Sequence, residues 1–199
     1  MKLYESLPYT VETKKKRYRI DPDFRNVLRM CDVLDNDLLL PSARYYLALK
    51  CIMKHPPRKT LEQIALVQAA TKMLFPNKDK PVNGKPLTSF SQDADLIRCA
   101  FRQSYGINLH TEKLHWLEFS ELLNGLPEGS RYAEVLGIRS RPMPKPTKYN
   151  AEQRASLTRA KQMFALHAEN EKDQERQYES DVKNIALGLI AFAAKGSEQ

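Results

Sequence analysis

The segment "DPDFRNVLRMCDVL", residues 21–34, restricts the fold more than any other part of the sequence. Asp21 is suited to cap a helix N-terminus, and Pro22 is suited to the first helical position, where no backbone N–H is needed. The apolar residues that follow recur at helical spacing and share one face: Phe24, Val27, Leu28, Cys31 and Leu34. This pattern predicts an amphipathic helix and is the clearest helix signal in the chain.

Two further segments carry similar helix signals. Residues 42–53 are predicted to form a helix that ends before two consecutive prolines. The next helix is predicted to begin at Thr60, with Gln63 at the spacing of a capping box, and to stop before Pro76. Its predicted apolar face contains Leu61, Ile64, Val67, Thr71 and Leu74. The polar segment 76–86, with three prolines, predicts a mobile loop.

The segment that follows predicts a helix with marked ends. Ser89 or Ser91 can cap it, and Asp93 and Asp95 fall in its first turn, where the helix dipole favours carboxylates. Its predicted buried face contains Leu96, Ile97, Ala100 and Phe101. Gly106 followed by an isoleucine is typical of a helix end in the left-handed conformation. The two aspartates could also form a metal pair, but capping carboxylates are far commoner at such a position.

The only tryptophan lies in "YGINLHTEKLHWLEFSELLNGL", residues 105–126. Trp116, Phe119 and Leu123 have the spacing of one helix face, and Gly125 is predicted to end that helix. The large apolar surface of the indole therefore belongs to a core. Together with Phe101 of the preceding helix, these three residues are the predicted structural core: Phe101, Trp116, Phe119 and Leu123.

Motifs that carry chemistry are not found in the sequence. His110 and His115 are five residues apart, so they lack the spacing of a zinc-binding helix. The seven glycines are scattered and form no phosphate-binding loop, and no nucleophile lies in a recognisable elbow. The three cysteines are far apart, which indicates reduced thiols. We therefore expect no enzyme, no catalytic residue, no cofactor and no metal site.

The N-terminal region predicts a short β-hairpin, because Tyr9, Val11 and Thr13 and then Tyr18 and Ile20 alternate around a run of lysines. It has no apolar region of the kind found in signal peptides. The longest apolar run, residues 185–194, is about half the length needed to cross a membrane. A cytoplasmic protein is expected.

The net charge of +8 is unevenly distributed. Residues 151–199 carry four Lys and three Arg against two Asp and six Glu, a net of −1, which leaves +9 on residues 1–150. The cations cluster in residues 14–19, 54–59 and 139–148. These clusters are either solvated loops or a surface that attracts nucleic acid or another acidic partner.

The C-terminal part has a different composition. Residues 139–150 contain three prolines and four cations without an acid, which predicts an extended linker. Asn150 with Gln153 is predicted to cap a final long helix, which completes a helical extension over 151–199. A row of apolar residues on this helix is the predicted partner-binding surface: Tyr178, Val182, Ile185, Leu189 and Phe192. Glu171 and Glu175 interrupt the row upstream, so a sustained coiled coil is not expected. Docking of the row on the domain itself remains an alternative to binding a partner.

Residues 1 to about 168 resemble the gene-product-fifteen family of bacteriophage proteins, found in long-tailed phages of Gram-positive hosts. The resemblance is carried by "LYESLP", by "YRIDPDFRNVL" after the hairpin, and above all by "SFSQDADLIRCAFRQSYGINL" and "LHWLEFSELLNGLPEGSRYAEVLGIRS". The chain departs from the family pattern at Asn108, where an aspartate is expected, and at Leu117, where a second tryptophan is expected. Residues beyond about Ala168 extend past the usual end of the family.

The resemblance implies a non-enzymatic tail-assembly protein, encoded beside the gene for the tape-measure protein and present in the host bacterial cytoplasm. A tape-measure protein is a long helical chain with apolar stripes that are exposed before assembly, and a helical partner with apolar grooves can shield it. The expected function is therefore that of a tail-assembly chaperone or scaffold, with the tape-measure protein as partner and homo-oligomers as a further option. The alternative, from the positive charge, is a basic nucleic-acid-binding protein.

These predictions combine into one architecture. The chain is expected to be mainly α, with a hairpin and helical core domain over residues 1–138. A basic, proline-rich linker over 139–150 and a long C-terminal helix over 151–199 are expected to follow.

Overall fold

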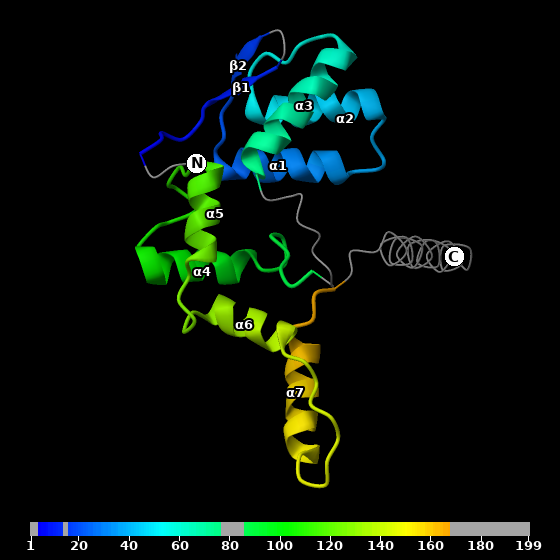
Figure 1. Cartoon of the computed structure of the whole chain (residues 1–199), viewed down its shortest axis with the longest axis vertical. Helices are drawn as coiled ribbons and strands as arrows, with labels where there is room; N and C mark the ends of the chain where they lie inside the picture. The colour runs from blue at the N-terminus through cyan, green and yellow to red at the C-terminus, as the bar shows by residue number, and fades with distance from the viewer. Residues whose placement is uncertain (1–3, 14–15, 77–85, 168–199) are drawn as a thin grey trace, which may run out of the picture. The chain divides into compact units, whose positions relative to one another are not determined.

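The computed structural model describes residues 4–13, 16–76 and 86–167. The chain is mainly helical with a two-stranded antiparallel sheet near the N-terminus, which confirms the predicted fold class (Figure 1). It divides into two compact units, Met1–Pro142 and Met143–Gln199. In the described part of the chain the elements are β1 (Thr10–Glu12), β2 (Arg17–Arg19), α1 (Phe24–Asp35), α2 (Pro41–Ile52), α3 (Thr60–Leu74), α4 (Ala94–Tyr105), α5 (Trp116–Asn124), α6 (Arg131–Ser140) and α7 (Ala151–Met163).

The predicted hairpin is present, with Val11 opposite Tyr18 in the register of β1 and β2. Val11 is buried while its neighbours in β1 are exposed, as the alternating pattern predicts for a strand with one covered face. The turn is closed by Thr13, whose backbone N–H donates to the Lys16 carbonyl at 2.8 Å. An ion pair between Glu12 and Arg17 joins the two strands at their exposed ends.

Helix α1 begins two residues later than the sequence predicted. Asp23 rather than Asp21 is the N-cap, and its side chain accepts from the Arg25 N–H at 3.0 Å. The reason is a short bridge to a distant segment. The Trp116 N–H donates to the Pro22 carbonyl at 2.8 Å, and the Phe24 N–H donates to the Leu114 carbonyl at 3.0 Å. This pairing requires extended backbone around Pro22, so the helix cannot start there.

Helix α3 has the predicted bounds, and Val67 and Leu74 are buried as predicted, but the rest of its buried face differs from the predicted one. Its buried residues are Gln63, Leu66, Val67, Ala70 and Leu74. Leu61, predicted for the core, is 84% exposed. The predicted capping box is also wrong, because Thr60 is the first helical residue and no side chain caps the helix. The Gln63 amide instead donates to the Pro57 carbonyl at 2.7 Å, which fixes the preceding loop.

The second half of this unit is built on α4, α5 and α6. Gly106 ends α4 at φ +70°, in the left-handed region that the sequence predicted for it. Helix α6 continues to Ser140, so Arg139 is a helical residue and not the first residue of the predicted linker. The predicted loop over residues 76–86 falls largely on residues 77–85, which lie outside the described part of the chain.

The core of the unit Met1–Pro142 is built around a group of aromatic rings. The Phe119 ring stacks on that of Phe24 with centroids 4.6 Å apart and on that of Phe101 with centroids 5.2 Å apart. These contacts join α5 to α1 and to α4. Helices α1, α2 and α3 pack in sequence order, and β1 packs on α3, as Figure 1 shows near the hairpin. The hairpin is therefore attached to the outer side of the α1–α3 group.

In the unit Met143–Gln199, helix α7 begins at Ala151 as expected but ends at Met163. It is therefore shorter than the single long helix that the sequence predicted, and no glycine or proline marks this end. The Asn150 side chain does not cap it and instead binds the Thr147 N–H and the Lys145 carbonyl, both at 2.8 Å. Among the described residues no helix has the length and apolar character needed to cross a membrane.

Candidate functional site

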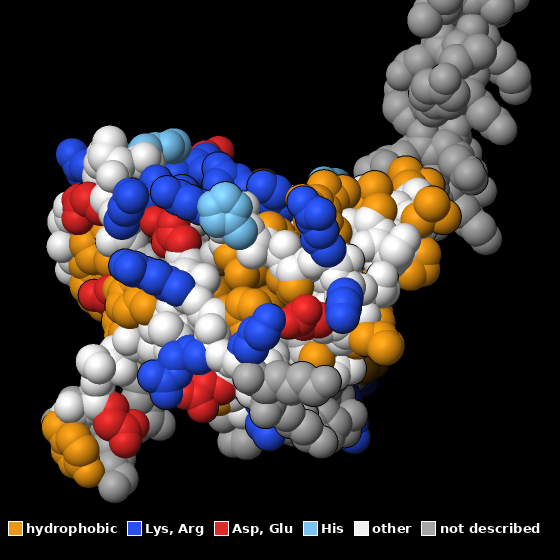
Figure 2. All heavy atoms as spheres, turned by 90° about the horizontal axis from the view of Figure 1, so that it is seen from above, with side chains coloured by type: hydrophobic (Ala, Val, Ile, Leu, Met, Phe, Trp, Pro, Cys, Tyr) orange, Lys and Arg blue, Asp and Glu red, His pale blue; other side chains and the backbone are white. Residues whose placement is uncertain are grey.

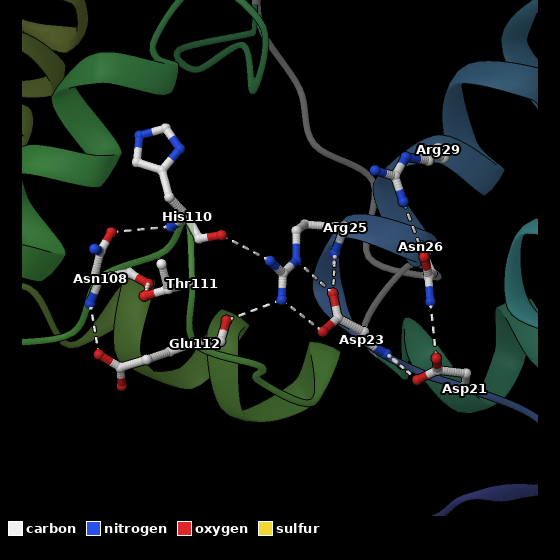
Figure 3. Close-up of polar contacts among 9 residues, drawn as sticks. All are labelled: Asp21, Asp23, Arg25, Asn26, Arg29, Asn108, His110, Thr111 and Glu112. Atoms are coloured by element: carbon white, nitrogen blue, oxygen red, sulfur yellow. Dashed lines mark hydrogen bonds and ion pairs between the residues drawn. The ribbon is translucent and has the colours of Figure 1, made fainter.

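The residues that could carry chemistry at the start of α1 form a polar network (Figure 3). Arg25 contacts both carboxylate oxygens of Asp23, at 2.9 and 3.0 Å. The same guanidinium donates to the backbone carbonyls of His110, at 3.2 Å, and Glu112, at 3.0 Å. Arg25 thus ties the N-terminus of α1 to the connection between α4 and α5. These donors of Arg25 are used to hold the two segments together.

The electrostatics of this network agree with a structural role. Burial alone would raise the pKa of Asp23, but hydrogen bonds from the Arg25 side chain and backbone outweigh it and hold that pKa below its usual range. The carboxylate therefore stays ionised. A carboxyl group that is fully engaged by a guanidinium is a poor general acid or base, because it neither holds nor easily gains a proton at neutral pH.

Asn108 explains how the chain tolerates one departure from the family pattern. Its side-chain oxygen accepts from the His110 N–H at 3.1 Å, and its own N–H donates to the Glu112 carboxylate at 2.9 Å (Figure 3). An aspartate oxygen would accept the first of these bonds equally well. The position thus needs an acceptor for a local turn, which both residue types supply.

His115, which the sequence left without a role, is the N-cap of α5. Its ring Nδ1 accepts from the Leu117 N–H at 3.1 Å, and its Nε2 lies 2.9 Å from the Pro8 carbonyl. The first contact requires an unprotonated Nδ1, so Nε2 carries the hydrogen and donates to Pro8. Histidine is not a common capping residue. Only the position of His115, directly before the predicted helix, could have indicated its capping role from the sequence.

Replacing His115 by alanine is expected to lower the free energy of unfolding by about 1–2 kcal/mol, because it removes a helix cap and a hydrogen bond of a buried ring. The control is His110→Ala, which removes an exposed ring and should lower the free energy of unfolding by less than about 0.5 kcal/mol. Urea unfolding followed by circular dichroism measures both. Equal losses in the two variants would contradict the capping role.

The aspartate pair considered in the sequence, Asp93 and Asp95, does not form a joint site. Asp93 is the N-cap of α4 and makes a two-pronged ion pair with Arg139 of α6, at 2.7 and 2.8 Å. Asp95 is exposed and pairs with Arg98 on its own helix. Over residues 4–13, 16–76 and 86–167 no group of three His, Cys, Asp or Glu side chains could hold a metal ion.

An exposed surface with a groove lies at the hairpin end of the first unit. Figure 2 looks down on this end and shows Lys and Arg side chains distributed over it, with apolar patches between them. A groove of about 1320 Å³ runs between Glu12, Thr13 and Lys16 of the hairpin and a second wall that Arg58, Lys59 and the exposed face of α3 up to Lys72 form. We call it the α3 groove. It brings together cations of two of the basic clusters of the sequence, Lys16 from the first and Arg58 and Lys59 from the second.

The hairpin is held beside α3 by contacts to Glu62. Tyr18 donates a hydrogen bond to the Glu62 carboxylate, and the Lys16 ammonium lies 3.7 Å from it. The hydrogen bond from Tyr18, followed by nearby lysines, holds the pKa of Glu62 below its usual range despite some desolvation. Glu62 is therefore a charged anchor for the hairpin and forms one wall of the α3 groove.

A second hollow, of about 780 Å³, lies on the other side of the hairpin. Its cations are Arg17, Arg19 and Lys54, and Tyr9 and His55 line it as well. It carries the same sign of charge as the rim of the α3 groove. Cations of two of the three clusters noted in the sequence, those at residues 14–19 and 54–59, thus lie on one basic face. Local sequence reasoning could not predict this face, because it depends on how β2 meets the α2–α3 connection.

The predicted site residues fall into two groups in the structure. Phe101, Trp116 and Phe119 are buried in the core, and Leu123 is half-buried against it. The predicted partner-binding residues Tyr178, Val182, Ile185, Leu189 and Phe192 lie outside the described residues. The α3 groove was not predicted from the sequence, in which Leu61 was assigned to the core.

Comparison with known proteins identifies the family. A family model described as "Bacteriophage Gp15 protein" matches residues 3–166, which is most of the chain and includes the segments that carried the resemblance. The match ends close to Ala168, beyond which the sequence was predicted to extend past the usual family end. No curated protein and no solved structure matches the chain. The chain belongs to the bacteriophage Gp15 protein family.

Proposed function

We propose that this phage protein is a non-enzymatic tail-assembly protein, which acts as a chaperone or scaffold on the tape-measure protein in the host cytoplasm. Family membership over residues 3–166 is the observation that carries the proposal. The side chains that could take part in a reaction support it as well, because Asp23 and His115 cap helices and Asp93 joins α4 to Arg139 of α6. A protein that shields or aligns another chain needs surfaces and no reaction centre.

The partner contact is proposed for the C-terminal apolar row. Tyr178, Val182, Ile185, Leu189 and Phe192 recur at helical spacing in the sequence, so a helix formed there would present one apolar side. An unassembled tape-measure chain has a matching need, because its own apolar stripes must be covered until the tail forms. Two such helices can cover each other, and a homo-oligomer would use the same row.

Co-expression tests this proposal. A tape-measure fragment from the same phage should be recovered in soluble form together with the full chain. Replacing Ile185 and Leu189 by aspartate should abolish this recovery, because two charges in the row prevent apolar packing. The matched control Asn184→Asp adds a charge beside the row and should leave the complex intact. Loss of the complex in the control, or its persistence in the double variant, would contradict the assigned surface.

A second candidate function is nucleic-acid binding, which the basic face at the hairpin end favours. The dependence of binding on salt concentration distinguishes the two candidate functions. Affinity that depends on phosphate contacts falls by about 10³- to 10⁵-fold between about 50 and about 200 mM salt when roughly six to ten phosphates are bound. An apolar contact with the tape-measure fragment should change little over that range. A complex that dissociates steeply with salt and includes DNA or RNA would favour the second function.

A further inference from the structure

We propose that the α3 groove is a docking site for an amphipathic helix of a partner protein whose apolar stripe is flanked by acidic residues. The groove lies within Met1–Pro142 and is separate from the C-terminal row. The inference rests on the proposed function only for the identity of the partner. Its physical basis is the shape, the apolar floor and the uncompensated charge of the groove.

The floor of the groove is one exposed face of α3. Leu61, Ala65 and Ala69 are four residues apart in turn, so they lie in one line along the helix. Leu61 is 84% exposed, and the two alanines are small enough for another helix to approach the α3 backbone closely. This line fits the ridge of apolar side chains on an incoming helix, which is the helix-in-groove mode of recognition.

This face has no cover within the described residues beyond the hairpin contact at its start. The opposite side of α3 is fully used, because Leu66, Ala70 and Leu74 are buried in the core. The hairpin contacts α3 through the packing of β1 and through Tyr18 and Lys16, which both contact Glu62 in the first helical turn. Further along the helix, Ala65, Gln68 and Lys72 are exposed and line the groove, so this part of the floor can be reached by a partner.

The charge on the rim specifies the partner. Both acids of the groove are engaged, Glu12 by Arg17 and Glu62 by Tyr18 and Lys16. Arg58, Lys59 and Lys72 line the rim, and no ion pair joins any of them to a carboxylate of the described residues. The rim thus offers cations near both ends of the apolar floor, with Arg58 and Lys59 before the first turn of α3 and Lys72 in its last turn. A helix that carries Glu or Asp beside its apolar stripe complements this arrangement.

Nucleic acid fits this groove less well than a helix. Single-stranded nucleic acid is bound by stacking its bases on aromatic rings, and none of the described residues that line the α3 groove is aromatic. The groove, at about 1320 Å³, also exceeds the roughly 300–1,000 Å³ of ordinary small-molecule sites. An elongated, apolar occupant with acidic flanks is the ligand class that remains.

The direct test uses a fluorescent peptide of about 20 residues, long enough for a stable amphipathic helix, with leucines at helical spacing flanked by glutamates. A matched peptide has lysines in place of the glutamates. Fluorescence anisotropy with the full chain should show binding of the acidic peptide and none of the basic one. Equal binding of both peptides, or of neither, would overturn the proposal.

Variants then locate the binding. Leu61→Glu places a like charge in the floor and should weaken binding of the acidic peptide by at least about tenfold, the loss expected for a central contact. Lys72→Glu should weaken it as well, and the salt dependence should decrease. The matched control is Leu38→Glu, at a leucine that is 90% exposed in the α1–α2 connection, outside the groove. Circular dichroism checks that all three variants fold.

Other occupants are excluded by named results. If Leu61→Glu and Leu38→Glu have equal effects, the groove is not the site. Self-association of the full chain that Leu61→Glu abolishes would assign the groove to a second copy and overturn the proposal. The proposal would also be overturned if an oligothymidylate displaced the peptide and bound equally well to the wild type and to Leu61→Glu.

The groove and the proposed function can fail separately. If the tape-measure fragment co-purifies with the chain but the acidic peptide does not bind, the groove assignment fails alone. If the peptide binds in a Leu61-dependent manner but no tape-measure fragment co-purifies, the proposed function fails while the groove assignment stands.

Discussion

Replacement of Trp116 by alanine is expected to lower the free energy of unfolding of the helical unit by about 3–5 kcal/mol. The indole is 5% exposed, and its ring lies 5.1 Å from that of Phe75 and 5.8 Å from that of Phe119, measured between centroids. Its Nε1–H donates to the Leu74 carbonyl at 2.9 Å, at the last residue of α3. Alanine would leave a cavity between α3 and α5 and a carbonyl without its donor.

Two variants control for the separate parts of this effect. Trp116→Phe keeps most of the apolar volume and loses the N–H, so it should cost only about 1–2 kcal/mol. Leu38→Ala, at an exposed leucine, should change stability by less than about 0.5 kcal/mol. Urea denaturation gives all three values. A Trp116→Ala protein with an unchanged unfolding midpoint that no longer recovers the tape-measure fragment would show that Trp116 is a binding residue and not a core residue.

The helix ends that depend on local chemistry could be predicted from the sequence. The left-handed end of α4 at Gly106 and the end of α3 before Pro76 follow from what one residue can or cannot adopt. The hairpin followed in the same way, because its apolar and polar residues alternate over a few positions. Such features depend on residues that are adjacent in the chain, so they can be read directly from the sequence.

The features that the sequence missed depend on distant contacts. Helix α1 starts at Phe24 because Pro22 pairs with Trp116, and nothing near residue 22 indicates that pairing. Arg139 appeared to open a linker because three prolines follow within seven residues, yet its partner Asp93 lies on another helix. Capping rules rank residue types, but tertiary contacts choose among the candidates.

The candidate site was missed for a related reason. Leu61 has the spacing of a core residue relative to the other apolar residues of α3, so periodicity assigned it inward. The helix is apolar on more than one side, and the packing of α2 decides which side is buried. The basic clusters were visible in the sequence, but their meeting beside α3 was not.

Loss of the ion pair between Asp93 and Arg139 is expected to cost about 3–5 kcal/mol when only the arginine is removed, as in Arg139→Ala. The Asp93 side chain is 2% exposed and that of Arg139 is 11% exposed, so the variant leaves a buried charge without its partner. The Ser89 N–H, at 3.0 Å from the carboxylate, and the Thr88 hydroxyl, at 3.4 Å, remain but supply only neutral donors. The cost thus comes mainly from the stranded carboxylate.

The pH dependence of stability gives a second measure of this pair. Burial would raise the pKa of Asp93, but hydrogen bonds from Arg139 and the Ser89 amide outweigh it and lower that pKa. Since the folded pKa lies below the unfolded value of about 3.9, the pair stabilises the fold above that value and loses this contribution as the pH falls through the folded pKa. The wild type should therefore lose more stability than a variant without this carboxylate when the pH falls below about 4.

The double variant Asp93→Asn with Arg139→Met distinguishes the cost of a buried charge without a partner from the cost of losing the ion pair itself. It should be more stable than Arg139→Ala, because neither charge remains buried and methionine refills the space along α6. It should also lose the part of the acid sensitivity that belongs to Asp93, as measured by urea unfolding at a series of pH values. The exposed pair of Asp95 and Arg98 is the matched control, and Arg98→Ala should cost no more than about 1 kcal/mol. If Arg98→Ala and Arg139→Ala cost the same, burial does not determine the strength of the pair, and α6 is held to α4 by its apolar contacts alone.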